Sequence, residues 1–345
     1  MRRLFHYFAG GRTPAGPPRI RFPALLAALM VAGLQSGAAA LAQEWPTRPL
    51  TMVVPFAAGG GADLLGRIIA PGISEFLGEQ VVVENVGGAG GVTGSYRVVK
   101  APPDGYQFVL GSSGTHSQSQ SLYKRPLYNA ATDFAPVMLV IEQPIMLIAR
   151  RDLPVANLAQ FIAYTRANQE RMQFASAGTG SAVHLACVLF NAAIGVHVTH
   201  IPYRGTGPAM QDLIGGRIDY QCPVASAVVP QVESNQVKAI AVLTKQRAPN
   251  LPDLATAQEQ GLDNFEAGIW FALFLPKGTP MAIVQKLQRA ALATVDTPSV
   301  QEKLRAIGGL PMAPERRTPE YLGKFVASEI EKWAAPIKAS GVSAD

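Results

Sequence analysis

The chain has 345 residues, of which 48% are hydrophobic and 16% are charged. It is longer than one typical compact domain and has enough apolar residues for two buried cores, which excludes an intrinsically disordered protein. The formal net charge is +6, but five Arg lie before residue 43, and the rest of the chain carries 25 basic against 24 acidic residues. No stripe of Lys and Arg remains to follow a phosphate backbone, so we expect no nucleic-acid partner.

The first 42 residues have the pattern of a secretory signal peptide. A basic segment, Met1–Arg21, precedes an apolar run of 13 residues, Phe22–Leu34, and small residues then lead to Ala42. The alternative is an uncleaved anchor helix, but the apolar run is short for a bilayer span. We therefore expect cleavage near Ala42 and export to the periplasm. No Cys lies near this position, so we expect no lipid anchor.

The segment after the signal peptide predicts an α/β fold with largely parallel strands. Three short β-rich runs, Pro49–Pro55, Gln80–Glu84 and Gln107–Leu110, are each followed by a loop rich in Gly or Ser. Apolar residues at helical spacing follow the first two loops, from Leu64 and from about Thr93. A strand, a glycine turn and a helix in this order form a β–loop–α unit, and its repetition indicates an α/β sheet.

A second series of alternating elements follows a long apolar run, Val137–Ala149. Its predicted elements are helix Leu158–Asn168, strand Met172–Ala175, helix Ala182–Ile194, strand Val198–Ile201, helix Gly207–Gly215, strand Ile218–Cys222 and strand Lys238–Leu243. Another apolar run, Phe265–Leu275, and two amphipathic helices, Pro280–Val295 and Pro319–Ser340, complete the chain. We interpret the two apolar runs as strands that cross between two lobes.

This order of elements predicts two α/β lobes that are joined by two crossings. We assign residues 1–42 to the signal peptide, residues 43–142 and 268–345 to lobe 1, and residues 143–267 to lobe 2. Lobes connected in this way enclose a cleft that suits a ligand, and the crossing strands can serve as the hinge when the lobes close.

Two cysteines are present, Cys187 and Cys222. In an exported protein an even number of Cys indicates a disulfide, and two separate buried thiols are the alternative. Given the expected compartment we favour the disulfide. Its role is structural, because the chain contains no C-x-x-C redox motif.

Four loops share a composition that suits the binding of an anion. They are Phe56–Asp63, Gly111–Thr115, Ser176–His184 and Tyr203–Pro208. Loops that follow parallel strands converge at one edge of a sheet, and the unpaired N–H groups of a helix N-terminus attract negative charge. Asp63 and Ser181 are expected to cap the helices that follow. For each loop taken alone, an ordinary glycine turn is the alternative.

Motifs of common enzyme and metal sites are absent from the chain. It has no G-x-G-x-x-G, Walker A, H-E-x-x-H or G-x-S-x-G sequence, and the S-x-x-K match at Ser121–Lys124 lacks its companion motifs. His197 and His200 have a spacing that places them on opposite faces of a predicted strand. We therefore expect no catalytic residue, no cofactor and no metal. His184 is equally consistent with a ligand contact and with an ordinary, partly buried histidine.

Short motifs also recur along the chain in a distinctive combination. The first part contains Trp45-Pro46-x-Arg48-Pro49, Val53–Asp63 (VVPFAAGGGAD), Val83-Glu84-Asn85, Gly88–Gly91 (GAGG) and Pro103–Tyr106 (PDGY). The second part contains Gly178–Ser181 (GTGS) with His184-Leu185, Ile201–Gly205 (IPYRG), Pro208–Leu213 (PAMQDL) and Leu275–Pro280 (LPKGTP). From about Trp45 to the C-terminus the sequence thus resembles the Bug/TctC family of extracytoplasmic solute receptors.

The resemblance implies a two-lobed, periplasmic-binding-protein-like type II (Venus-flytrap) fold of the α/β class, with two crossing strands. Receptors of this family trap a small carboxylate or related metabolite with backbone N–H groups and hydroxyls. Carried over by motif, the ligand-binding residues are Ala58, Gly59, Gly60, Asp63, Ser112, Ser113, Thr115, Thr179, Ser181, His184 and Tyr203. Ala57-Ala58 stands where the family often has Pro-Pro, so the first loop is expected to be less rigid.

The predicted function is that of a monomeric periplasmic receptor. It would close on the carboxylate and deliver it to the membrane permease subunits of a tripartite tricarboxylate transporter. Two alternatives stay open. A ligand-sensing subunit for a signalling receptor would use the same closed lobes, whereas a secreted α/β hydrolase would need a nucleophile–base pair that the motifs do not provide.

Overall fold

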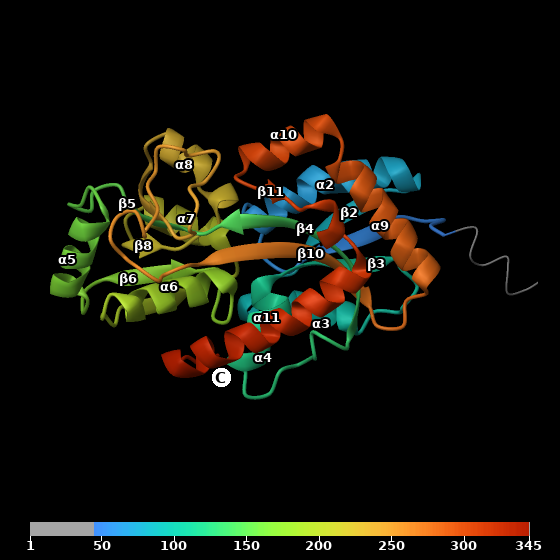
Figure 1. Ribbon diagram of the computed structural model, residues 1–345, viewed down its shortest axis with the longest axis horizontal. Coiled ribbons are helices and arrows are strands. Elements are labelled where there is room, and N and C mark those ends of the chain that lie inside the picture. The colour runs from blue at the N-terminus through green and yellow to red at the C-terminus, as the bar shows by residue number, and fades with distance from the viewer. Residues whose placement is uncertain (1–44, 345) are drawn as a thin grey trace, which may run out of the picture. The chain divides into compact units, whose positions relative to one another are not determined.

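The computed structural model describes residues 45–344, and the expected signal peptide (1–42) with its cleavage site lies outside the described residues. From Pro46 onward the chain contains two β-sheets with helices packed on them (Figure 1). We call the six-stranded sheet with its helices lobe 1, and the five-stranded sheet with its helices lobe 2. The expected boundaries after residues 142 and 267 stay a prediction, since this part of the chain is one compact unit.

Lobe 1 is built on strands in the order β11-β4-β10-β3-β1-β2. The strands are β1 (Leu50–Val54), β2 (Val81–Asn85), β3 (Gln107–Ser112), β4 (Phe134–Pro144), β10 (Gly268–Pro276) and β11 (Leu310–Pro311). The helices are α2 (Gly61–Leu77), α3 (Val92–Val99), α4 (Ser119–Leu122), α9 (Met281–Val295), α10 (Pro298–Ala306) and α11 (Pro319–Ser340), with short 3₁₀ turns η1 (Ala89–Gly91) and η4 (Pro314–Arg316) and a π-helical turn η2 (Gly114–Gln118).

Lobe 2 is built on strands in the order β7-β6-β8-β5-β9. The strands are β5 (Met146–Arg150), β6 (Gln173–Ser176), β7 (Thr199–Pro202), β8 (Tyr220–Gln221) and β9 (Val237–Val242). The helices are α5 (Leu158–Asn168), α6 (Ala182–Ala193), α7 (Thr206–Ile214) and α8 (Val229–Glu233), with a 3₁₀ turn η3 (Ala225–Ala227).

The sheets are mixed and not largely parallel as the sequence pattern predicted. β1, β2 and β3 are parallel to one another, and so are β6, β7 and β8. In each lobe, the strand at which the chain arrives from the other lobe is antiparallel to its neighbours. β10 is antiparallel to β3 and β4, and β5 is antiparallel to β8 and β9. A chain that leaves a sheet and returns beside its exit strand must reverse direction, and Figure 1 shows β4 and β10 side by side, with β4 running toward lobe 2 and β10 returning from it.

The apolar run Val137–Ala149 forms two strands instead of one. β4 ends at Pro144 and β5 begins at Met146, and Ile145 between them forms an isolated bridge with Val224 and accepts a hydrogen bond from the Leu243 amide. Pro144 is the last β4 residue that pairs with β10, opposite Gly268, and it has no N–H with which to continue the ladder. The break places the change from one sheet to the other at Pro144–Ile145.

Predicted helix bounds agree best where the sequence carries strong caps. α5 begins after Asn157, whose side chain accepts a hydrogen bond from the Gln160 amide. α11 begins after Thr318, which accepts from the Tyr321 amide, and ends at Gly341 in the left-handed conformation (φ 68°). A side-chain acceptor before the helix and a glycine after it satisfy end groups that have no partner within the helix.

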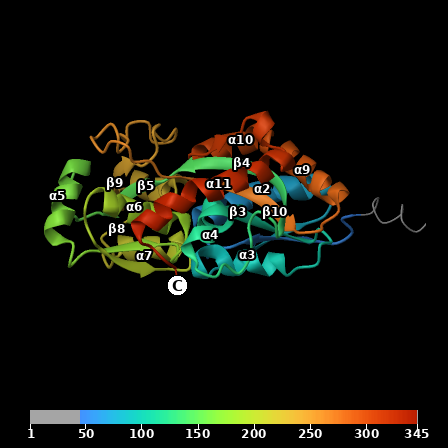
Figure 2. The same ribbon diagram turned by 60° about the horizontal axis from the view of Figure 1, so that its bottom comes forward.

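Each lobe has its own hydrophobic core. The core of lobe 1 includes Val109, Leu139 and Phe274, and that of lobe 2 includes Met146, Ile148 and Met210. A smaller cluster joins the lobes: Leu122 of α4 and Ile337 of α11 pack with Leu185 of α6, where the C-terminal end of α11 reaches lobe 2 (Figure 2). Within residues 45–344, no helix combines the length and the apolar character needed to cross a bilayer.

The predicted disulfide is confirmed. Cys187 of α6 and Cys222, which follows β8, are bonded across a Cα–Cα distance of 5.5 Å. Both side chains are buried. The bond therefore ties α6 to the sheet of lobe 2.

Candidate functional site

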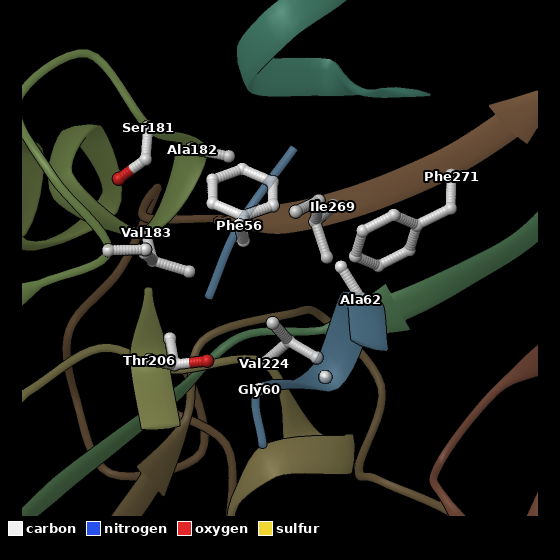
Figure 3. Close-up of a pocket in the computed structure, with 12 residues that line it drawn as sticks. Phe56, Gly60, Ala62, Ser181, Ala182, Val183, Thr206, Val224, Ile269 and Phe271 are labelled. Atoms are coloured by element: carbon white, nitrogen blue, oxygen red, sulfur yellow. The ribbon is translucent and has the colours of Figure 1, made fainter. Parts of the chain in front are cut away.

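A small cavity lies between the lobes where the first turns of three helices converge (Figure 3). Gly60–Ala62 at the start of α2, Ser181–Val183 at the start of α6 and Thr206 at the start of α7 contribute to its lining. The remaining wall is apolar and includes Phe56, Ala177, Val224 and the β10 side chains Ile269 and Phe271. The cavity volume is about 20 Å³.

The helix starts supply hydrogen-bond donors to this cavity. α2 begins after Gly60 and α7 after Gly205, and neither glycine can offer a side-chain acceptor to the first-turn amides. α6 begins after Ser181, whose Oγ accepts from the His184 amide at 3.2 Å. First-turn amides have no carbonyl partner within the helix and lie at the positive end of its dipole. The arrangement therefore favours an anion without any cationic side chain.

In lobe 1, Asp63 holds the first loop and does not line the cavity. Its carboxylate accepts hydrogen bonds from the Gly59 amide (3.0 Å), Arg67 Nε (3.0 Å) and Asn85 Nδ2 (3.0 Å). Burial alone would raise the pKa of this carboxyl, but the hydrogen bonds outweigh burial and keep the pKa below its usual value. The expectation that Asp63 caps α2 was wrong. Gly60 occupies the cap position, and Asp63 reaches back from the first turn.

Ser112 and Thr115 satisfy each other inside lobe 1. The Ser112 amide donates to Thr115 Oγ1 at 2.9 Å, and this hydroxyl also lies 2.8 Å from His116 Nδ1. Ser113 Oγ is buried and has no partner among the described residues. Gly114 instead brings this segment against lobe 2, because a Cβ atom here would lie 2.6 Å from the Ala182 amide nitrogen. The backbone of this loop therefore approaches α6, whereas the side chains predicted to bind ligand (Ser112, Ser113 and Thr115) do not line the cavity.

In lobe 2, a neutral histidine pair supports the second loop. His184 Nδ1 accepts from the Gly180 amide at 3.3 Å, and the His184 and His200 rings lie 4.2 Å apart. His200 Nε2 lies 2.7 Å from Ser176 Oγ, which itself accepts from the Gly178 amide. Burial lowers the pKa of His184 to about 3, helped by His200, and burial lowers the pKa of His200 to about 4. Both rings are therefore uncharged at neutral pH.

The other predicted residues lie at the rim where the lobes meet. Ala58 and Gly59 are exposed, and Gly207 of lobe 2 lies against them. Thr179 and Tyr203 border a surface groove, where Tyr203 Oη donates to Asp212 Oδ2 at 2.6 Å. Burial, with Asp212, raises the pKa of Tyr203 to about 12.

The lobes touch closely around the cavity. The Ala57 amide of lobe 1 donates to the Arg204 carbonyl of lobe 2 at 2.9 Å, and Ser226 Oγ of lobe 2 donates to Gln143 Oε1 at 3.0 Å. Gly90 has φ +61° and packs on the Thr179 carbonyl so tightly that a Cβ atom would overlap it. The structure is thus a closed form, in which glycine backbone faces backbone.

Of the predicted ligand-binding residues, the structure brings Gly60 and Ser181 to the cavity. Val224, Ile269 and Phe271 also line it, and sequence reasoning did not identify them as site residues. Their apolar side chains have the pattern of core positions, and no local signal separates a core residue from a cavity wall. Among residues 45–344, no group of three or more His, Cys, Asp and Glu is placed to hold a metal ion.

Comparison with solved structures supports the architecture. The periplasmic binding protein BugD is 41% identical, with a TM-score of 0.84 over 87% of this chain and 99% of that chain. MatC from Rhodopseudomonas palustris with bound malate is 38% identical, with a TM-score of 0.82 over 84% of this chain and 99% of that chain. R. palustris Rpa4515 with adipate is 35% identical, with a TM-score of 0.82 over 87% of this chain and 99% of that chain.

These similarities confirm the expected periplasmic-binding-protein fold with two lobes and two crossing strands. The family model described as tripartite tricarboxylate transporter family receptor, TctC, matches residues 65–342. This match covers most of both lobes, including the starts of α6 and α7. The chain therefore belongs to the TctC family of receptors, which are solute-binding proteins.

Proposed function

We propose that this chain is a periplasmic receptor, exported with cleavage near Ala42, that closes its lobes on a small carboxylate. The observation that carries the proposal is the convergence of the first turns of α2, α6 and α7 on one cavity. Amides that have no helix partner can donate to carboxylate oxygens, and such charge-assisted hydrogen bonds gain strength where water is excluded.

The relatives support this ligand class. MatC is described with malate and Rpa4515 with adipate, and both are carboxylates. The family description supports delivery of the ligand to the permease subunits of a tripartite tricarboxylate transporter. We propose that the receptor acts as a monomer, and that delivery to a permease is its output in preference to signalling.

Closure follows from the position of the donors on both lobes. The α2 amides belong to lobe 1, and the α6 and α7 amides belong to lobe 2. A carboxylate between them gains contacts that neither lobe offers alone, so it favours the closed form by its differential affinity. We propose that Gly60 contacts the ligand through its backbone, and that Ser181, whose own amide donates to the Gly178 carbonyl at 3.1 Å, lies beside the α6 amides that do so. Asp63, Ser112, Thr115 and His184 then act by holding the loops in place.

We infer binding without catalysis. Ser181 Oγ donates to the Gly178 carbonyl at 2.7 Å, and His184 Nδ1 accepts from the Gly180 amide. The Ser181 hydroxyl and the neighbouring His184 imidazole are thus each engaged with backbone groups of the loop. A hydrolase requires the two to share a hydrogen bond as nucleophile and base.

A thermal-shift screen of the processed protein against small carboxylates and neutral metabolites tests the proposal. A ligand that binds only the folded state adds roughly 2.7 kcal/mol of stability at a hundredfold excess over its Kd. We expect a rise in Tm with carboxylates and recovery of the ligand unchanged after incubation. A rise with neutral metabolites alone would contradict the carboxylate assignment, and consumption of the ligand would contradict the absence of catalysis.

A further inference from the structure

The side chains around the cavity are unusually poor in polar groups for a site that holds an anion. None of the lining residues is Lys, Arg, His, Asp, Glu, Asn or Gln. The polar side chains there are Ser181 and Thr206, and Figure 3 shows both on the lobe 2 side of the cavity. Any charge on the ligand must therefore be met by backbone amides and by these hydroxyls.

The two hydroxyls differ in what they can offer a ligand. Ser181 Oγ donates to the Gly178 carbonyl and accepts from the His184 amide, so both of its roles are taken by its own loop. Thr206 is 6% exposed, and its hydroxyl makes no hydrogen bond with any residue between 45 and 344. It lies beside the start of α2, since a Cβ atom on Gly60 would be 2.6 Å from Thr206 Oγ1. Thr206 is therefore placed to donate to a group held at the α2 amides.

The room for polar groups is small. The first turns of α2, α6 and α7 border a cavity of about 20 Å³, which suits the oxygens of a single carboxylate. Phe56, Val224, Ile269 and Phe271 form the apolar wall of the same cavity, and the rest of a ligand held there would lie against them. A second carboxylate against this wall would lose its hydration without gaining a hydrogen-bond partner, which weakens binding.

We propose that the ligand of this receptor is a compact monocarboxylate with an apolar substituent. The carboxylate is bound by the first-turn amides with Thr206, and the substituent packs on the apolar wall. This assignment rests on the proposed receptor function and narrows it. It sets this chain apart from MatC and Rpa4515, whose ligands malate and adipate carry two carboxylates.

Two matched pairs of acids test the proposal by titration calorimetry on the processed, ligand-free receptor. 4-Methylpentanoate and succinate share their first carboxylate and spacer, and an isopropyl group replaces the second carboxylate. 2-Hydroxy-4-methylpentanoate and malate differ in the same way. We expect the monoacid of at least one pair to bind about a hundredfold more tightly than its diacid, as for a site that leaves a buried polar group unpaired.

Each result has a distinct meaning. A diacid that binds as tightly as its monoacid, or more tightly, overturns the monocarboxylate assignment and leaves the receptor function intact. Failure of all four acids to bind, while a neutral metabolite raises Tm, overturns both proposals.

A substitution tests the role of Thr206. We expect Thr206→Val to weaken binding of the preferred monoacid about tenfold, as expected for loss of one hydrogen bond to a charged group. Thr199→Val, on an exposed position of β7 in the same lobe, is the matched control and should leave the Kd unchanged. An unchanged Kd for Thr206→Val, with Tm equal to that of the control, would remove Thr206 from the site.

Discussion

The loops of the two lobes that meet at the cavity are held by different interactions. In lobe 1, the carboxylate of Asp63 organises its loop through Gly59, Arg67 and Asn85. In lobe 2, the Cys187–Cys222 disulfide fixes α6. The neutral ring of His184 accepts a hydrogen bond from the loop, and the neutral ring of His200 lies beside the loop serine, Ser176. Both solutions hold helix N-termini at the cleft, yet one depends on an ionised group and the other on a covalent bond and uncharged rings.

The largest expected effect comes from breaking the disulfide. The bond closes a loop with a sequence separation of 35 residues, and its loss should lower the free energy of unfolding by about 3 kcal/mol. We expect Cys187→Ala/Cys222→Ala to speed hydrogen exchange in α6 and β8. The segment Gly59–Arg67 of lobe 1 should keep its protection. An equal loss of protection in both lobes would contradict the assignment of separate supports.

Replacing Asp63 should have the next largest effect, and in the other lobe. In Asp63→Asn one carboxylate oxygen becomes an amide that faces N–H donors, which leaves buried donors unsatisfied and should lower the free energy of unfolding by about 2 kcal/mol. Urea unfolding and hydrogen exchange of the Phe56–Asp63 loop measure the change. Glu266→Gln is the control, because Glu266 pairs with Lys245 at an exposed position and should alter stability by less than about 1 kcal/mol.

A smaller, pH-dependent effect should separate the two loops. The pKa of His200 is about 4 in the folded chain and lies near 6.5 when unfolded, so its contribution is complete above pH 6.5 and is lost as pH falls toward 4. His184 follows the same direction, while the lowered pKa of Asp63 keeps its contribution until pH falls below about 4.

We therefore expect the hydrogen-exchange protection factors of residues 176–184, which correct for the pH dependence of the intrinsic rate, to fall between pH 7 and 5, while those of residues 56–63 change little. In His200→Gln the loss of stability over this range should be smaller by about 1 kcal/mol, after allowing for solvent screening of a half-buried ring. His116 is buried in lobe 1, and burial lowers its pKa to about 3. It adds a dependence of stability on pH that is the same in the variant and in the unmodified protein. A pH profile identical to that of the unmodified protein would contradict a role for His200.

The smallest expected effect concerns Arg67. Its side chain is 55% exposed and pairs with Asp63 at spacing i, i+4, so Arg67→Gln should cost only about 0.5 kcal/mol in urea unfolding. The Asp63 carboxylate would keep the Gly59 and Asn85 donors. An effect as large as that of Asp63→Asn would show that the ion pair, and not the buried hydrogen bonds, holds the loop.

Local sequence patterns determined much of this molecule. Capping residues and apolar spacing set the bounds of α5 and α11, glycine loops after strands marked the helix starts at the cleft, and the two cysteines left a single possible pair. These features depend on neighbours within one or two turns of the chain, or on a count of residues, and both can be read without coordinates.

Tertiary structure decided which groups face the cavity. Asp63 hydrogen-bonds to its own loop, and Ser112 and Thr115 hydrogen-bond to each other. Val224, Ile269 and Phe271, which are distant in the sequence from the start of α2, form the wall. It also decided the mixed sheets, because β10 and β5 enter their lobes from opposite directions. The physical reason is that a binding surface between lobes is made by residues distant in the chain. Local propensity sets the element, and only packing across the cleft sets what its side chains and amides meet.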